Sequence, residues 1–134
     1  MNIIDSSCWI EYLMNSSIGT DIAPIIENPE ELMVPTITMY EVYKKLSTEK
    51  GVDYAMTIIS YMQSGTVVEL DSNLSVLAAQ ISLKYKLPMA DSIIYATTIN
   101  YSATLFTADQ HFKDLSDVRY YPKLELRGIE PLTS

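Results

Sequence analysis

The amino-acid sequence predicts an α/β fold, a three-layer α/β/α sandwich built around a central, mostly parallel sheet. Short apolar runs of the kind found in buried strands alternate with longer segments of helical periodicity. Such alternation favours parallel pairing, with helices packed on both faces of the sheet. The chain has 134 residues, of which 48% are hydrophobic, and this size suits one domain over residues 1–134 with a sizeable core.

The first part of the chain predicts two strands separated by two helices. Residues 2–4 are short and apolar, as a buried parallel strand is. A helix follows over about residues 7–14, and a second over residues 18–27 is stopped by Asn28-Pro29. Residues 32–35 are then predicted to form the second strand.

Two consecutive helices are predicted next. Thr36 or Thr38 is a candidate cap for a helix that runs to about Lys50, where Gly51 ends it. Residues 52–63 form a further helix with an apolar stripe, which we expect to take part in a homodimer interface. The stripe consists of Tyr54, Ile58, Tyr61 and Met62.

The remaining elements repeat the alternation of strand and helix. Residues 66–70 predict a third strand, and Asp71-Ser72 is a cap signal for a helix over residues 74–85. Pro88 suits the first turn of another helix that runs to about Tyr101. The chain is then predicted to form a strand over residues 103–106, a short helical turn over 108–112 and an edge strand over 118–121.

Four carboxylates with apolar neighbours stand out. Asp5 and Asp109 follow predicted strands, whereas Glu41 and Asp91 lie on predicted helices. A carboxylate seldom stays buried unless it is paired or binds a metal. Ligands of parallel α/β sheets bind beyond the carboxyl ends of the strands, so Asp5 and Asp109 are expected to meet there. Mg²⁺ and Mn²⁺ prefer oxygen ligands, and such ions activate water for phosphodiester hydrolysis.

Each of these acids also has an ordinary structural role open to it. Asp5 precedes a predicted helix and can cap it, and Asp109 can cap the part of the short turn that follows it, Gln110–Phe112. Glu41 stands four residues before Lys45, the favourable order for a helical ion pair. Asp91 lies in a first helical turn, where negative charge suits the macrodipole. The combination favours a shared site, which two further acids are close enough in sequence to join, Asp114 and Asp117.

The chain carries a net charge of −8, from 9 basic and 17 acidic residues. This balance argues against broad affinity for nucleic acid, which depends on Lys and Arg neutralising phosphates. It does not exclude an enzyme that acts on nucleic acid, because acids that hold cations no longer act as bare negative charge. The basic residues form three groups, each either a solvated face or a phosphate contact: Lys44, Lys45 and Lys50; Lys84 and Lys86; and Lys113, Arg119, Lys123 and Arg127.

The sequence predicts a cytoplasmic protein without a membrane partner. No apolar run approaches the ~20 residues of a membrane helix, and Asp5 and Glu11 come too early for a signal peptide. A single cysteine, Cys8, fits a reducing compartment. Cys8 and the lone histidine, His111, form one conceivable catalytic pair, although a cysteine in an apolar stretch usually packs in the core.

Four segments of the chain resemble PIN-domain proteins, specifically the VapC-type toxins of bacterial and archaeal toxin–antitoxin pairs. Their order and spacing agree with that family across nearly the whole chain. The segments are residues 3–13 (IIDSSCWIEYL), 35–42 (PTITMYEV), 87–97 (LPMADSIIYAT) and 105–112 (LFTADQHF).

The resemblance implies an endoribonuclease that depends on Mg²⁺ or Mn²⁺ and uses a metal-activated water. It implies an acidic pocket in which Asp5, Asp91 and Asp109 supply most metal contacts and Glu41 positions a water. By the same likeness Ser6 or Thr107 hydrogen-bonds these carboxylates or a metal-bound water. The family is usually dimeric and is neutralised by a cognate antitoxin, and a basic antitoxin peptide would complement an acidic cleft. Three tyrosines flank the acids and are candidates to stack on bases: Tyr40, Tyr43 and Tyr95.

One departure and two alternatives accompany this hypothesis. The position two after Asp109, often acidic in relatives, is His111, which is either solvated or a pH-sensitive phosphate contact. A receiver-like signalling domain also has an acidic Mg²⁺ pocket, but it needs adjacent acids after the first strand, where this chain has Ser6 and Ser7. A PIN domain that binds RNA or a protein without cutting is the second alternative.

Overall fold

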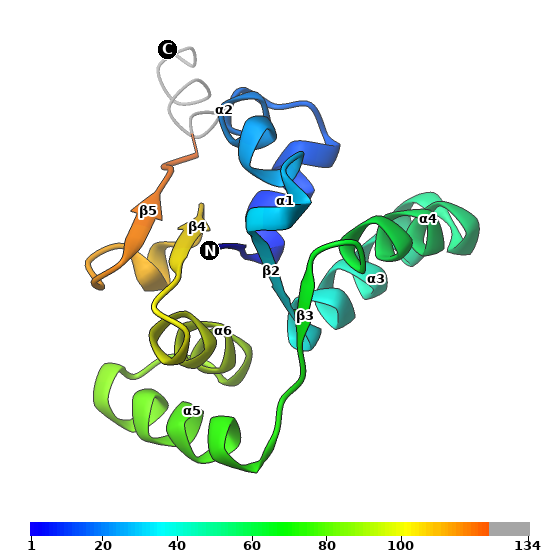
Figure 1. Cartoon of the computed structure of the whole chain (residues 1–134). Helices are drawn as coiled ribbons and strands as arrows, with labels where there is room; N and C mark the ends of the chain where they lie inside the picture. Colours follow the sequence, from blue (N-terminus) through cyan, green and yellow to red (C-terminus); the bar gives the residue numbers. More distant parts are fainter. Residues whose placement is uncertain (124–134) are drawn as a thin grey trace.

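A computed structural model describes residues 1–123 and confirms the α/β/α sandwich (Figure 1). Five strands form one sheet in the order β3-β2-β1-β4-β5, and each neighbouring pair is parallel. The strands are β1 (Asn2–Ile4), β2 (Leu32–Pro35), β3 (Thr66–Val68), β4 (Thr104–Thr107) and β5 (Val118–Tyr120).

Within residues 1–123, six α-helices connect these strands, with two short 3₁₀ turns. The predicted helices are confirmed, with ends shifted by one or two residues, while the first 3₁₀ turn has no counterpart among the predicted elements. The helices are α1 (Ser6–Leu13), α2 (Ser17–Ile26), α3 (Thr36–Lys50), α4 (Val52–Met62), α5 (Ser72–Tyr85) and α6 (Met89–Asn100), and the turns are η1 (Pro29–Glu31) and η2 (Gln110–Phe112).

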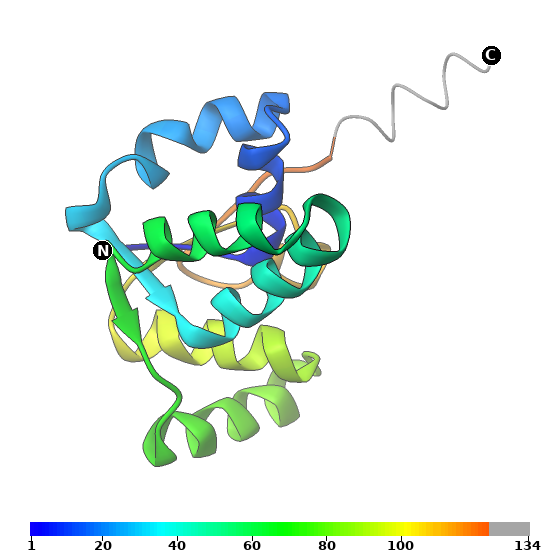
Figure 2. The ribbon, with the colours of Figure 1, turned by 90° about the vertical axis from the view of Figure 1, so that its right-hand side faces the viewer.

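The three central strands, β2, β1 and β4, bury both of their faces, which explains why they are apolar runs, whereas the edge strands β3 and β5 are partly exposed. Helices α1 to α4 cover one face and α5 and α6 the other, as the two perpendicular views show (Figures 1 and 2). Neighbouring strand residues divide between two core clusters: Ile4 and Phe106 pack toward α1 to α4, whereas Ile3 and Leu105 pack toward α5 and α6. This alternation is the period-two geometry of a strand.

The central strand β1 is where the winding of the sheet reverses. The chain moves outward through β2 and β3 on one side of β1, and through β4 and β5 on the other. Ile4 stands opposite Phe106, and the amide of Asp5 donates to the carbonyl of Phe106 at 3.1 Å. The residues that follow β1 and β4 therefore emerge side by side at the crevice where doubly wound folds bind ligands.

Several local predictions need correction. Neither Thr36 nor Thr38 caps α3, which begins directly after Pro35, and the buried Thr38 hydroxyl has no hydrogen-bond partner within residues 1–123. The third strand ends at Val68 instead of Leu70 because β3 lies at the edge of the sheet and the chain turns into solvent there. By contrast, Asp71 caps α5 as predicted, accepting from the amide of Leu74 at 2.8 Å.

The apolar stripe of α4 faces the interior more than the surface. Met62 is fully buried, and Ile58 and Tyr61 pack against the core cluster. The Tyr61 hydroxyl also donates to the carbonyl of Ile26 at 2.6 Å. This stripe is therefore largely used within the fold, and only Tyr54 of its four residues is counted among the exposed hydrophobic side chains. Over the described part of the chain, no helix combines the length and apolar character needed to cross a membrane.

Candidate functional site

The topology brings all four predicted acids to one edge of the sheet. Asp5 and Asp109 follow β1 and β4 directly or within two residues. Glu41 lies in the second turn of α3, which starts where β2 ends. Asp91 lies in the first turn of α6, which leads into β4. Because α6 ends near the start of β4, it begins at the opposite edge of the sheet, where the carboxyl ends of the strands lie.

Asp5 is the most enclosed of these acids. It is only 3% exposed and serves as the N-cap of α1. Its Oδ1 accepts from the Ser7 hydroxyl at 2.6 Å and from the Cys8 amide at 3.0 Å. Its Oδ2 accepts from the Thr107 hydroxyl at 2.5 Å. The carboxylate therefore caps a helix with one oxygen and faces the end of β4 with the other.

Asp91, Asp109 and His111 form a compact group at the end of β4. Each residue offers one atom that could bind a metal ion, and these three atoms lie within 4.8 Å of one another. The imidazole Nδ1 of His111 is 2.8 Å from Asp91 Oδ2 and 3.0 Å from Asp109 Oδ1. Thr107 connects this group to Asp5, because its hydroxyl also accepts from the Asp109 amide at 2.9 Å.

The surroundings of Asp5 and Asp91 disfavour the ionised forms of both carboxyl groups. Burial raises the pKa of Asp5 to about 6, because its effect is larger than the opposing effect of the three hydrogen bonds. The negative charge of Asp109 adds to the rise in this pKa. Burial and the neighbouring Asp109 raise the pKa of Asp91 to about 7. The pKa of His111 is raised as well, chiefly by the charge of Asp109. A cation placed among these groups would therefore be stabilised by carboxylates that otherwise tend to hold protons.

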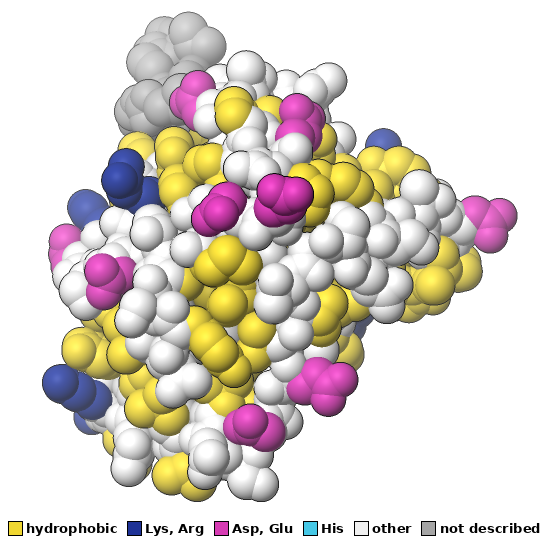
Figure 3. All heavy atoms as spheres, viewed as in Figure 1, with side chains coloured by type: hydrophobic (Ala, Val, Ile, Leu, Met, Phe, Trp, Pro, Cys, Tyr) yellow, Lys and Arg dark blue, Asp and Glu magenta, His cyan; other side chains and the backbone are white. Residues whose placement is uncertain are grey.

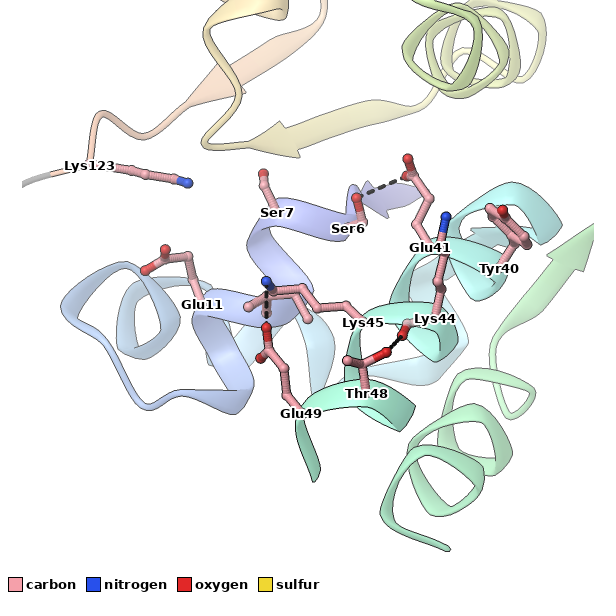
Figure 4. Close-up of a pocket in the computed structure, with 11 residues that line it drawn as sticks. Ser6, Ser7, Glu11, Tyr40, Glu41, Lys44, Lys45, Thr48, Glu49 and Lys123 are labelled. Carbon is pink, nitrogen blue, oxygen red and sulfur yellow. Dashed lines mark hydrogen bonds and ion pairs between the residues drawn. The ribbon is translucent and has the colours of Figure 1, made fainter. Parts of the chain in front are cut away.

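Glu41 does not belong to the compact group and lies beside the N-terminal end of α1. Its carboxylate accepts from the Ser6 hydroxyl at 2.9 Å (Figure 4). The expected ion pair between Glu41 and Lys45 is wrong, since Lys45 pairs with Glu49 one turn further on at 2.8 Å. Glu41 is thus turned toward α1 and the site instead of along its own helix.

Two hollows meet beside the acids. A cleft of about 550 Å³ lies between α1 and α3 and is lined by Glu41, Lys44 and Tyr40 among others (Figure 4). A second hollow of about 1050 Å³ is lined by Asp109 and His111. Ser7 and Lys123 line both hollows, so together the two make an extended depression past the acidic residues.

The molecular surface shows the acidic balance of the chain. On the face drawn in Figure 3, Asp and Glu side chains are spread widely, whereas Lys and Arg lie mostly toward the left edge of the view. Lys44, Lys45 and Lys123 line the cleft next to the acids, and Lys45 is paired there with Glu49. Arg127, grouped with Lys123 by sequence, lies outside the described residues.

Other sequence candidates lie away from the site. Asp114 and Asp117 are exposed and do not belong to the compact group. Tyr95 is fully buried and donates to the Ser116 carbonyl at 2.9 Å, so it does not stack on a base. Cys8 is buried in the core, which raises the pKa of its thiol far above the usual range and rules out the Cys8–His111 pair.

The sequence did not predict the contact that His111 makes with Asp91. The position of His111, two after Asp109, gave a signal that it lies near the site, but nothing in the sequence indicates contact with Asp91, twenty residues earlier. That contact depends on how η2 turns the chain after β4. Asp109 caps η2 by accepting from the His111 amide at 2.9 Å, and this directs the histidine side chain back toward α6.

The fold and the site define a doubly wound α/β protein with a candidate cation site at the point where its winding reverses. Residues 3–118 match the PIN domain family, and the chain belongs to that family. The match confirms the resemblance in the four sequence segments and decides against the receiver-like alternative. No curated protein matches the chain.

Some solved structures of similar fold are described as a toxin or as a toxin–antitoxin complex. A toxin–antitoxin complex from Klebsiella pneumoniae matches with a TM-score of 0.75 and 16% identity, over 92% of this chain and 100% of that one. VapC20 from Mycobacterium tuberculosis, described as a sarcin-ricin loop cleaving toxin, gives 0.72 and 15%, over 91% and 100%. FitAcB from Neisseria gonorrhoeae gives 0.67 and 19%, over 91% and 97%. At these identities the likeness shows the shared fold alone.

Proposed function

We propose that this protein is an endoribonuclease that depends on Mg²⁺ or Mn²⁺ and acts as the toxin of a toxin–antitoxin pair. The observation that carries the proposal is the group of Asp91, Asp109 and His111 beside the buried Asp5, at the carboxyl ends of β1 and β4 in a PIN domain. The similar structures support it, since one is described as a cleaving toxin and another as a toxin–antitoxin complex.

The donor set fits a divalent cation. Two carboxylate oxygens and one imidazole nitrogen lie within 4.8 Å of one another, and Asp5 adds a carboxylate near Asp109. The pKa values of Asp5 and Asp91 are raised, so bringing in positive charge would offset the cost of ionising both. When bound, such an ion supplies Lewis-acid activation of water and neutralises charge on a phosphodiester.

The surrounding side chains hold the acids in place for this chemistry. The hydroxyls of Ser7 and Thr107 fix both oxygens of Asp5, and the Ser6 hydroxyl fixes Glu41. We assign Glu41 the task of positioning the attacking water, because its carboxylate lines the cleft just outside the compact group. No covalent protein nucleophile is required, which agrees with the burial of Cys8.

The substrate is proposed to lie along the two adjoining hollows. Lys44 and Lys123 offer ammonium groups for phosphates on one side of the acids, and the exposed Tyr40 ring, beneath the Lys44 ammonium at 5.8 Å, offers a face for a base. With so few cations near the site, we expect weak salt dependence of binding and little affinity for nonspecific duplexes. Single-stranded or looped RNA suits such a depression best.

Two protein partners belong to this proposal. A cognate antitoxin with a basic segment would complement the acidic site and the net charge of −8. A homodimer is also expected, and exposed apolar side chains such as Leu83 and Met89, which are 77% and 74% exposed, are better placed to be covered than the α4 stripe. Light scattering of the purified protein measures this oligomeric state directly. The cytoplasm remains the expected location.

Cleavage of total cellular RNA by purified, antitoxin-free protein tests the enzymatic part. Reactions contain Mg²⁺, Mn²⁺ or EDTA, and wild-type protein is compared with Asp91→Asn. Asp71→Asn is the matched control, since it makes the same change at an acid that caps α5 and Asn caps equally well. Discrete fragments that need metal and disappear only with Asp91→Asn support the nuclease. Absence of cleavage by folded wild-type protein would favour a PIN domain that binds without cutting.

A further inference from the structure

We propose that His111 is itself a ligand of the bound cation, through Nδ1, and that this nitrogen makes the site prefer Mn²⁺ or another transition ion to Mg²⁺. The inference rests on the proposed cation site, and it goes further by naming a nitrogen ligand and a metal preference. Its starting point is the placement of Nδ1 between two carboxylate oxygens, at 2.8 Å from Asp91 and 3.0 Å from Asp109.

The backbone holds His111 in this place. Asp109 caps η2 by accepting from the His111 amide, and the adjacent Phe112 is fully buried in the core beneath α5 and α6. The loop is therefore anchored on both sides of the histidine. Although the ring is 55% exposed, its Nδ1 is turned toward the site and not toward solvent. An ion that contacts Asp91 and Asp109 from between them would meet this nitrogen as well.

The chemistry of the donors sets the metal preference. Mg²⁺ is a hard ion that takes oxygen ligands and usually keeps several waters, whereas imidazole suits transition metals. A site of carboxylates alone would accept Mg²⁺ readily. Adding one nitrogen favours Mn²⁺ over Mg²⁺, and later transition ions more strongly still, following the general order of divalent affinities.

A competing role for His111 leaves the metal preference unchanged. In that arrangement the ring only hydrogen-bonds the two acids, and it swings out or is displaced when an ion arrives. Removing the ring would then strengthen binding of every divalent ion, because the acids would be released from a partner. The two roles therefore predict opposite effects of the same substitution.

Pulsed electron paramagnetic resonance of bound Mn²⁺ separates these roles. His111 is the only histidine of the chain, so in protein without an affinity tag an imidazole nitrogen coupling to Mn²⁺ identifies it. We expect this coupling in wild-type protein and its loss in His111→Asn. Bound Mn²⁺ without nitrogen coupling would overturn the inference while leaving the cation site intact.

Calorimetric titration of the metal-free protein with each ion at about pH 8 provides the second readout. In wild-type protein Mn²⁺ should bind more tightly than Mg²⁺, and His111→Asp should reduce that ratio of affinities by about tenfold or more. Tighter Mn²⁺ binding by His111→Asn than by wild type would overturn the inference. If neither folded wild-type protein nor the folded control variant Asp71→Asn binds either ion, the proposed cation site is wrong, and so is the proposed nuclease.

Discussion

Replacing Asp5 by Asn should stabilise the metal-free protein at neutral pH while destroying its site. The carboxyl pKa is about 6 in the folded chain against an ordinary value of 3.8. Between these values the native state binds more protons than the unfolded state, so the free energy of unfolding falls as the pH rises. Above pH 6 the full penalty of the buried charge is about 3 kcal/mol.

Asn removes the charge and keeps most of the contacts. Its side-chain oxygen can accept from the Cys8 amide, and Asn is as good an N-cap as Asp. Its amide group, however, faces the Thr107 hydroxyl, which loses the oxygen to which it now donates. That loss subtracts about 1 kcal/mol. The expected net gain in the free energy of unfolding is about 2 kcal/mol at pH 8, and it shrinks toward zero near pH 5.

Urea unfolding in EDTA at both pH values measures this difference. Asp71→Asn serves as control, because it makes the same change at an exposed helix cap, where no buried charge is removed. Addition of Mn²⁺ should reverse the order of stability, since only wild-type protein gains from binding. The reasoning fails if Asp5→Asn is less stable than wild type at pH 8, or if the difference in free energy of unfolding is the same at both pH values. Either result would mean that the three hydrogen bonds outweigh the cost of burying the charge.

Four other predictions follow from the structure. Asp91→Asn should abolish the rise in melting temperature that Mn²⁺ gives wild-type protein. Calorimetric Mn²⁺ affinity should weaken as the pH falls below about 7, because protons then compete for Asp91. Gly19→Ala should lower the free energy of unfolding by about 2 kcal/mol or more in urea, since the added Cβ would lie 2.3 Å from the Glu11 carbonyl oxygen of α1. Tyr95→Phe should cost about 1 kcal/mol through the lost bond to Ser116 and leave RNA cleavage unchanged.

The elements of the fold were predictable because their signals are local. Asp71 caps α5 and Gly51 ends α3 through contacts within a few residues, and buried parallel strands carry apolar runs regardless of their partners. The errors arise where a choice depends on distant residues. Thr38 offers a suitable cap residue, yet α3 begins at the end of β2 and the Thr38 side chain is buried against the fold.

The site was predictable as a location but not as a set of contacts. Parallel topology alone brings Asp5 and Asp109 together, whereas the pairing of His111 with Asp91 depends on the packing of η2 against α6. The sequence also posed capping and site roles for Asp5 as alternatives. The structure shows that the two oxygens of one carboxylate can cap α1 and face Thr107 at once.

The pairing of the first strand with the fourth has a consequence during synthesis. Asp5 leaves the ribosome early, but the Thr107 hydroxyl that completes its surroundings is 102 residues further along the chain. At translation rates of roughly 5–20 residues per second, the nascent chain spends several seconds with β1 lacking a partner on its β4 side. A chain that has not yet reached β4 therefore has the first acids but no site. The activity proposed here would begin only after β4 and η2 have been made.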